Sequence, residues 1–207
     1  MKIAKAYRIE TDRLVIRCYQ PSDASKLKEA IDNSLDHLLP WMPWAKNEPE
    51  DLETKINRLR QFRGWFDLDK DYVFGIFDKE EASLIGSTGL HTRVGDAARE
   101  IGYWISAAYT GKGFATEAVS ALTKVGFEIE DLERIEIHCS PDNLRSQNIP
   151  RKLGYKLEAT LLQRAVDTYG NPRDTMIWSI FKAAYAAHPI KQMELKVFDA
   201  IGRRLLF

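Results

Sequence analysis

The stretch YTGKGFATEA, residues 109–118, decides how this chain folds, because it joins an apolar segment to a helical one through two closely spaced glycines. The segment before it, EIGYWI at residues 100–105, alternates β-branched and aromatic residues with other types, as a strand does. In residues 115–129, apolar side chains recur at steps of three and four, as on one face of an amphipathic helix. The sequence therefore predicts a strand, a glycine turn and a helix in direct succession.

The glycine turn has the chemistry of a phosphate-binding site. Gly111 and Gly113 let the backbone approach a ligand closely, and the first N–H groups of the following helix have no intrahelical partners. The partial positive charge of that helix end favours a pyrophosphate over residues 111–116, with Lys112 nearby. An ordinary tight turn has the same pattern, so this motif alone leaves both interpretations open. The spacing excludes a P-loop, and Thr116 stands where a dinucleotide fingerprint has its third glycine.

A second stretch, NLRS at residues 143–146 followed by IPRKLGY at 149–155, adds a family resemblance. Together with the glycine turn, it resembles the GNAT superfamily of N-acetyltransferases, whose pyrophosphate loop reads Arg/Gln-x-x-Gly-x-Gly/Ala. Thr110 stands where that family usually has Gln or Arg, which removes one side-chain contact and leaves the backbone donors in place. Residues 11–17, 38–44 and 100–105 are similar to the branch that acetylates the N-termini of ribosomal proteins.

The resemblance implies one α/β (α+β) domain over residues 8–182, with a mixed sheet of about seven strands and about four helices. The strands at residues 100–106 and 134–140 are expected to run parallel and splay apart around the pantetheine arm of acetyl-CoA, the expected co-substrate. Backbone N–H groups at the end of the first strand would reach the thioester carbonyl. Asn143 would hydrogen-bond the pantetheine amide, cap its own helix, or do both. The residues expected to bind acetyl-CoA are Ile105, Ser106, Gly111, Lys112, Gly113, Phe114, Ala115, Thr116 and Asn143.

Acetyl transfer to an amine needs two proton transfers, because the ammonium acceptor must lose a proton and the departing thiolate must gain one. We expect Glu100 to be the base, directly or through a water. His91 is the second candidate, since an ordinary histidine titrates near neutral pH. The alternative role of Glu100 is a solvated carboxylate paired with Arg99 or Arg134. The resemblance implies Ser146 as the donor to the thiolate, and its alternative role is a polar residue in the first helical turn.

The loop PWMPW, residues 40–44, fixes two large aromatic side chains between prolines. Trp41 and Trp44 are either a hydrophobic clasp over the first helix or, by the family resemblance, part of the wall that faces the acceptor. The expected acceptor is a protein N-terminal α-amine. A small amine such as a polyamine or an antibiotic is the alternative, since acidic residues gather at positions 48–53. A CoA-binding module without catalysis is the third interpretation.

The composition of the 207 residues favours one well-packed domain. Hydrophobic residues make up 44% of the chain, which is enough for a single core. Lysine plus arginine and aspartate plus glutamate number 30 each, so nothing indicates nucleic acid or an anionic membrane as a partner. No apolar run is long enough to span a bilayer and the N-terminus lacks an export segment, so we expect a cytoplasmic protein.

No metal site is expected from the sequence. Cys18 and Cys139 lie in expected strands and are interpreted as small apolar core residues rather than as a disulfide, metal ligands or nucleophiles. The histidines are too scattered along the chain for the spacing of metal ligands. They are His37, His91, His138 and His188.

The remaining pattern predicts the other elements. Strands are expected at residues 13–18, 72–77, 84–90, 135–139, 156–164 and 174–181, and helices at 24–38, 50–66 and 143–154. Residues 183–207 form an extension beyond the domain, in which apolar residues from Ile190 to Leu205 fall at helical spacing. We expect an amphipathic helix over residues 190–205 that packs on the domain or on a second subunit, so that the protein is a monomer or a homodimer.

Overall fold

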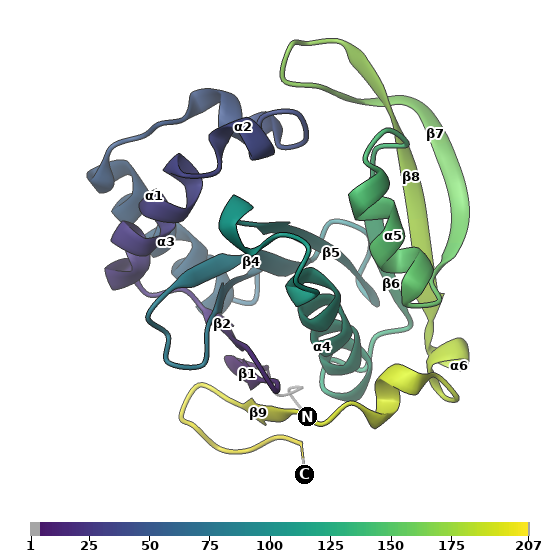
Figure 1. Ribbon diagram of the computed structural model, residues 1–207. Helices are drawn as coiled ribbons and strands as arrows, with labels where there is room; N and C mark the ends of the chain where they lie inside the picture. The colour runs from purple at the N-terminus through teal and green to yellow at the C-terminus, as the bar shows by residue number, and fades with distance from the viewer. Residues whose placement is uncertain (1–4, 207) are drawn as a thin grey trace.

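The computed structural model describes residues 5–206, and a sheet of nine strands runs through this part of the chain. The strands lie in the order β7-β8-β6-β5-β4-β3-β2-β1-β9 (Figure 1). They are β1 (Arg8–Glu10), β2 (Val15–Cys18), β3 (Tyr72–Phe77), β4 (Leu84–His91), β5 (Ala98–Ile105), β6 (Arg134–Cys139), β7 (Lys156–Val166), β8 (Pro172–Phe181) and β9 (Lys196–Phe198). The α-helices are α1 (Ala24–Asp32), α2 (Leu35–Leu38), α3 (Leu52–Asp67), α4 (Phe114–Glu128), α5 (Leu144–Lys152) and α6 (Lys182–Tyr185). None of these helices is long and apolar enough to cross a membrane.

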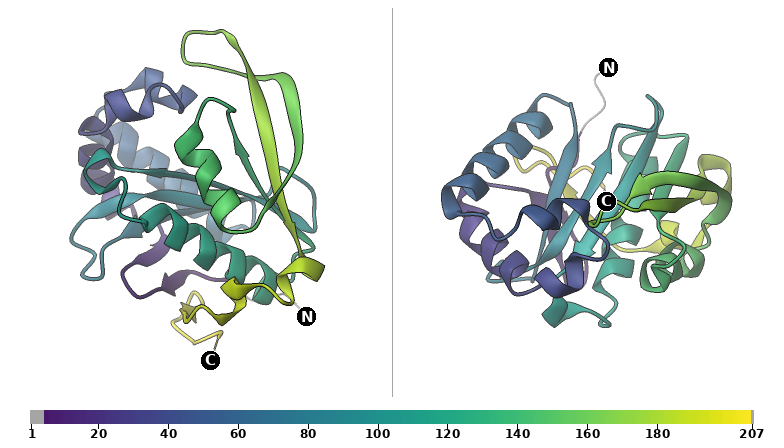
Figure 2. Two further views of the ribbon diagram at one scale, coloured as in Figure 1. Left: turned by 45° about the vertical axis from the view of Figure 1, so that its right-hand side comes forward. Right: turned by 90° about the horizontal axis from the view of Figure 1, so that it is seen from above.

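Helices cover both faces of the sheet, and a hydrophobic core lies under each layer. On one face, α1 and α3 pack on each other and on β3 and β4, whereas α4 packs against β4 and β5 from the other face (Figure 1, Figure 2). The first core joins Leu27 and Leu59 of the helices to Val73 and Phe77 of the sheet. The buried residues of α4 include Ala118, Val119, Leu122 and Val125, which confirms the predicted amphipathic helix. Cys18 and Cys139 are buried and have free thiols, in agreement with their interpretation as small apolar core residues.

β5 and β6 form the one parallel pair among the described strands, and they separate soon after they meet. Residues 98–100 pair with residues 134–136, whereas β5 continues to Ile105 and β6 to Cys139 without further pairing to each other. A parallel pair needs a crossover connection, and α4 supplies it. The separated ends form the splay that the family resemblance implies.

The predicted C-terminal helix over residues 190–205 is wrong. A short 3-10 turn at Pro189–Gln192 is followed by β9, which pairs antiparallel with β1. Val197 of β9 is fully buried, and the chain then turns back so that the Leu205 N–H donates to the Val197 carbonyl at 2.7 Å. The edge of β1 carries backbone N–H and C=O groups that need partners, and these favour a strand over a helix. β1 and β9 together raise the sheet from the expected seven strands to nine.

The single helix predicted over residues 24–38 is divided into α1 and α2. Ser34 lies between them, and its hydroxyl reaches the chain that follows β5. It accepts a hydrogen bond from the Ala107 N–H at 3.0 Å and donates one to Ser106 Oγ at 3.1 Å. The break therefore fixes α2, and the loop that carries Trp41, against the end of β5.

Val197 and Ile201 lie four residues apart, on the same face of the predicted helix. Substitutions at these two positions therefore distinguish the observed strand from that helix. Val197 is fully buried, whereas Ile201 is 75% exposed. We expect Val197→Ala to lower the free energy of unfolding by about 2 kcal/mol, through lost burial and a cavity. The control Ile201→Ala is expected to change it by less than about 0.5 kcal/mol. Urea unfolding measures both free energies. Equal decreases in the two variants would contradict the strand and favour the predicted helix.

Candidate active site

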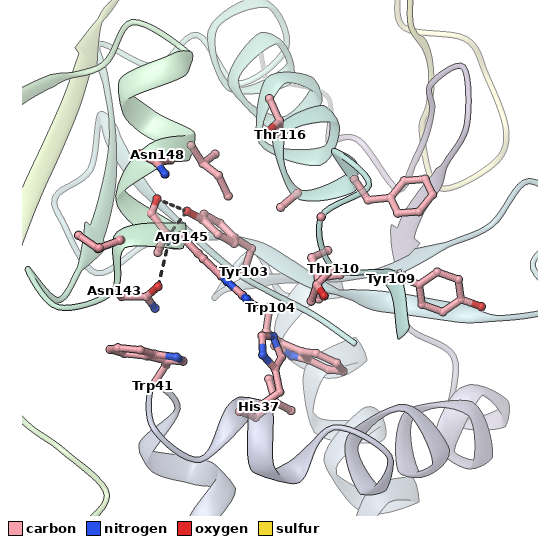
Figure 3. A pocket seen from close by; sticks show the side chains of 18 of the residues that line it. His37, Trp41, Tyr103, Trp104, Tyr109, Thr110, Thr116, Asn143, Arg145 and Asn148 are labelled. Atoms are coloured by element: carbon pink, nitrogen blue, oxygen red, sulfur yellow. Dashed lines mark hydrogen bonds between the residues drawn. The ribbon is translucent and has the colours of Figure 1, made fainter. Parts of the chain in front are cut away.

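A cavity of about 780 Å³ opens where β5 and β6 separate. Its walls come from α2, the end of β5, the glycine turn with the start of α4, and the start of α5 (Figure 3). Of the predicted cofactor-binding residues, seven line it, namely Ile105, Gly111, Gly113, Phe114, Ala115, Thr116 and Asn143. Residues that are far apart in the sequence are thus gathered around one opening.

The glycine turn presents free backbone donors to this cavity. Gly111 and Gly113 have φ angles of +75° and +82°, in the left-handed region that strains any other residue. α4 begins at Gly113 without a side-chain cap, and its first intrahelical bond runs from the Glu117 N–H to the Gly113 carbonyl at 3.1 Å. The N–H groups of residues 114–116 therefore have no intrahelical acceptor. Together with the helix dipole they form an anion-binding corner.

Sequence reasoning missed the residues that hold this turn in place. Glu117 accepts hydrogen bonds from Thr11 Oγ1 at 2.6 Å and from Arg13 Nε at 2.7 Å. Arg13 also donates to the Lys112 carbonyl at 3.0 Å, and its guanidinium lies 4.6 Å from the centre of the Phe114 ring. These contacts join segments about one hundred residues apart in the sequence, so no local sequence pattern predicts them.

Two of the predicted cofactor-binding residues, Lys112 and Ser106, do not line the cavity. Lys112 donates from Nζ to the Ala108 carbonyl at 2.9 Å and is not among the residues that line the opening. The Ser106 N–H donates to the Ile85 carbonyl of β4 at 2.8 Å, so it is not free for a ligand. Because N–H groups alternate in direction along a strand, the Ile105 N–H points to the opposite side, into the gap beside β6.

A second hollow, also about 780 Å³, lies on the face of the sheet that carries α1 and α3. Trp44 and Trp104 form part of its wall, with ring centres 6.1 Å apart. Six residues line both hollows, namely Trp41, Met42, Tyr103, Trp104, Asn143 and Ser146. The two hollows therefore meet at the end of β5 and the start of α5, and both predicted acceptor-wall tryptophans line the second one.

Tyr103 and Ser146 form a hydroxyl pair at this junction (Figure 3). Their oxygens are 3.0 Å apart, and the tyrosine hydroxyl also contacts the Ser146 carbonyl at 3.1 Å. That carbonyl lacks its usual helical partner, because Pro150 has no N–H to donate to it. Burial raises the pKa of Tyr103, so its hydroxyl stays protonated at neutral pH. Sequence reasoning had no signal for Tyr103, which reads as an ordinary strand aromatic.

Asn143 has the capping role that was one of its two predicted roles. Its Oδ1 accepts a hydrogen bond from the Ser146 N–H at 3.0 Å, at the N-terminus of α5. The amide nitrogen of the same side chain is left to face the hollow, since only the oxygen is used by the cap. Asn143 thus fixes Ser146 and still lines both cavities.

Glu100 is buried in the second hollow and is paired with an arginine that the sequence analysis did not name. Arg93 donates from Nε at 2.7 Å and from Nη2 at 2.6 Å to its two carboxylate oxygens. Burial raises the pKa of Glu100, but the hydrogen bonds from Arg93 and the nearby cationic groups outweigh it and hold the pKa below the ordinary value. The arginines named from the sequence bind elsewhere, Arg99 to Glu130 and Arg134 to Glu136.

Residues 13–156 match the family described as Acetyltransferase (GNAT) domain. This chain belongs to that family. Among relatives of this GNAT protein, the N-acetyltransferase YoaA of Bacillus subtilis (strain 168) is 30% identical over 84% of the chain and 96% of the relative. The ribosomal protein uS5-alanine N-acetyltransferase of Escherichia coli (strain K12) is 28% identical over 73% of the chain and 79% of the relative. The structure of the ribosomal L7/L12 α-N-protein acetyltransferase RimL with coenzyme A shares the fold, with a TM-score of 0.76 at 18% identity over 88% of this chain and 99% of that one.

The ion pair of Glu100 predicts a pH-dependent contribution to stability. Its pKa is lowered on folding, so the contribution is present above the ordinary glutamate pKa of 4.5 and is lost as the pH falls through the folded value. We expect Glu100→Gln to lower the free energy of unfolding by about 1 to 2 kcal/mol at pH 7, a modest figure because Arg93 is more than half exposed. The difference from the parent is expected to shrink between pH 5 and pH 3, which urea unfolding at each pH measures. A difference that grows toward low pH would contradict the pairing.

Proposed function

We propose that this chain transfers the acetyl group of acetyl-CoA to the N-terminal α-amine of a protein, with a ribosomal protein as the favoured acceptor. The observation that carries this proposal is the junction of two hollows at one hydroxyl pair, one hollow opening on the anion-binding corner and the other on an aromatic wall. The family match and the name of the Escherichia coli relative support the chemistry and the acceptor class. Such a reaction takes place where ribosomal proteins are made, in the cytoplasm.

On the cofactor side, the backbone supplies the main contacts. The N–H groups of residues 114–116 receive the pyrophosphate, and the two glycines of the turn keep side chains out of its way. The pantetheine arm lies in the gap between β5 and β6, where the Ile105 N–H donates to the thioester carbonyl and stabilises the oxyanion that forms on attack. Asn143 donates to a pantetheine carbonyl through its free amide nitrogen. Lys112 and Ser106 have no role in this proposal, because Lys112 does not line the cavity and the Ser106 N–H is bonded to the Ile85 carbonyl.

At the junction, Ser146 Oγ donates a proton to the departing thiolate and regains one from Tyr103, whose hydroxyl is reprotonated from water in the hollow. The carbon–nitrogen bond forms as the carbon–sulfur bond breaks, so the sulfur gains the proton that Ser146 loses. The 3.0 Å contact between the two oxygens provides the path for this relay.

Three of the four acidic residues that favoured a small polyamine acceptor are engaged elsewhere, and the fourth, Glu53, is exposed on α3 and lines neither hollow. Glu48 and Glu50 both bind Lys55, which is fully buried, and Glu50 also binds Arg58. Asp51 caps α3 by accepting from the Thr54 N–H at 2.7 Å. None of the three carboxylates lines either hollow. A polyamine site needs free carboxylates, so these pairings favour a peptide acceptor.

Thiol release from acetyl-CoA over a panel of acceptors tests the proposal. The panel holds peptides that begin with alanine or serine, spermidine, and an aminoglycoside, with hydrolysis measured in the absence of acceptor. We expect release above hydrolysis with peptides and not with the small amines. Thiol release only with the small amines would show that the acceptor is a small amine. Tight binding of acetyl-CoA with no thiol release over the panel would show a CoA-binding module without catalysis.

Gly113→Asp places a side chain and a negative charge in the anion-binding corner. We expect the Kd for acetyl-CoA in isothermal titration calorimetry to rise at least about tenfold, which corresponds to about 1.4 kcal/mol. The matched control is Gly170→Asp, since Gly170 has a φ of +87° in the β7–β8 turn and lies outside both hollows. Both variants suffer the same backbone strain, so an unchanged Kd in a folded Gly113→Asp protein would show that the site is misplaced.

Removal of either junction hydroxyl separates turnover from cofactor binding. Ser146→Ala and Tyr103→Phe are each expected to lower kcat about 100-fold while the Kd for acetyl-CoA stays within twofold. Tyr155→Phe is the control, because Tyr155 is another buried tyrosine whose hydroxyl bonds a hydroxyl, that of Thr123 at 2.6 Å, away from both hollows. Steady-state kinetics measures all three. A kcat unchanged in Ser146→Ala would remove this residue from the proton transfer.

A further inference from the structure

The second hollow contains a carboxylate–imidazole pair that the assignment above does not use. His91 ends β4, and its Nδ1 lies 2.8 Å from Oδ2 of Asp71, in the turn before β3. The other carboxylate oxygen of Asp71 accepts from the Thr92 N–H at 3.2 Å. Burial raises the pKa of Asp71, but its hydrogen bond to His91, the charge of that ring and backbone N–H groups outweigh it and keep the pKa below the ordinary value. An ionised carboxylate accepts, so it keeps the ring proton on Nδ1 and leaves a lone pair on Nε2.

The Nε2 side of His91 lies over the sheet surface that forms the floor of the second hollow. Two glycines without side chains leave space for the ring there. Gly89 and Gly102 are paired neighbours on β4 and β5. A Cβ atom on Gly89 would lie 2.6 Å from Nε2, and one on Gly102 would lie 3.1 Å from it. Any larger residue at Gly89 would push the ring away. The Nε2 edge of the imidazole therefore packs against these two glycines and occupies the space that side chains at their positions would fill.

The neighbouring titratable side chains on this sheet surface are already hydrogen-bonded or ion-paired to each other or to arginines. The sheet register places His91, Glu100 and Glu136 side by side on three neighbouring strands. Arg93 occupies both oxygens of Glu100. His138 lies between the two glutamates, with Nε2 at 2.6 Å from Glu136 and Nδ1 at 3.4 Å from Glu100. Among the described residues that line this hollow, His91 is thus the histidine with one ring nitrogen fixed and the other turned to the open space.

We propose that His91 is the base that takes the proton from the acceptor amine, and that Asp71 is the positioning residue that fixes its tautomer and direction. This inference rests on the proposed function. Gly102 and Ile105 are three residues apart, about 10 Å along the strand, so the proton crosses by hydrogen-bonded water in the hollow. The ammonium loses the proton, Nε2 gains it, and the ring releases it to solvent. Glu100 then acts as a fixed charge beside the base and not as the base itself.

The pH profile of kcat/KM separates these roles, measured with acetyl-CoA and the panel peptide that turns over fastest. His91→Asn keeps a nitrogen donor to Asp71 and removes Nε2. We expect kcat/KM at pH 7 to fall about 100-fold. The remaining rate is expected to rise with pH until the peptide α-amine is itself neutral, near pH 8. Glu100→Gln is expected to lower kcat/KM at pH 7 by less than about tenfold, because His91 still takes the proton.

Asp71→Asn tests the positioning role. The carboxylate holds the Nδ1 proton and the direction of the ring, so its loss is expected to free the ring to turn. The kcat value is expected to fall about tenfold with KM unchanged, because a differently oriented ring transfers protons poorly. The control Asp131→Asn removes an exposed carboxylate that binds Lys182 at the opposite end of α4, and the profile should stay that of the parent. A kcat that stays at the parent value in Asp71→Asn, or a larger loss of kcat/KM in Glu100→Gln than in His91→Asn, overturns the proposal.

A long-range ¹H–¹⁵N spectrum of the histidine rings reads the tautomer without any acceptor. The expected result is His91 protonated at Nδ1 in the parent protein and redistributed toward Nε2 protonation in Asp71→Asn. A parent ring protonated at Nε2 would overturn the proposed geometry even if peptides are acetylated. Conversely, a parent protein that acetylates no member of the panel defeats the proposed function, whatever the spectrum shows, so the two failures are distinct.

Discussion

The rest of the structure depends on the separation of β5 and β6. Each strand is held over six residue pairs by an antiparallel neighbour on its other side, β5 by β4 and β6 by β8. The pair itself shares three residue pairs and then parts, which leaves backbone groups such as those of Ile105 facing a gap. Buried backbone groups need partners, and an arm that carries amides of its own can satisfy them. The fold therefore presents a slot whose chemistry matches an amide-containing ligand.

Two sets of contacts decide what lies at the two ends of the gap. At one end, the glycine turn is fixed by Glu117 and Arg13, so the free amides of α4 point at a defined place. At the other end, Tyr103 of β5 reaches the first turn of α5 and contacts both Oγ and the carbonyl of Ser146. Pro150 makes that carbonyl available, so the proline that would weaken a helix elsewhere contributes to the site here. The slot thus connects an anion-binding corner to a pair of hydroxyl groups.

The opposite face of the sheet shows how charge is arranged beside an apolar wall. Glu100 and Glu136 are both buried, and each has an arginine and a histidine nearby. Buried charges are tolerated when they are paired. Removal of one partner leaves the other as an uncompensated buried charge, which destabilises the fold. This pairing holds both carboxylates in fixed hydrogen bonds. Asp71 and His91 form a separate pair in which one ring nitrogen is left open to the hollow.

By itself, the sequence determined the strand, glycine turn and helix around residues 100–128, the strands β3 and β4, and the helix α5, because period and turn chemistry are local properties. It also determined the family, through two motifs in a fixed order. Tertiary structure alone decided that the tail pairs with β1, that Arg93 rather than Arg99 binds Glu100, and that Tyr103 and Asp71 lie at the site. The physical reason is that register, edge pairing and burial of charge depend on residues distant in the chain, such as Arg13 and Glu117, and no local pattern encodes which of them meet.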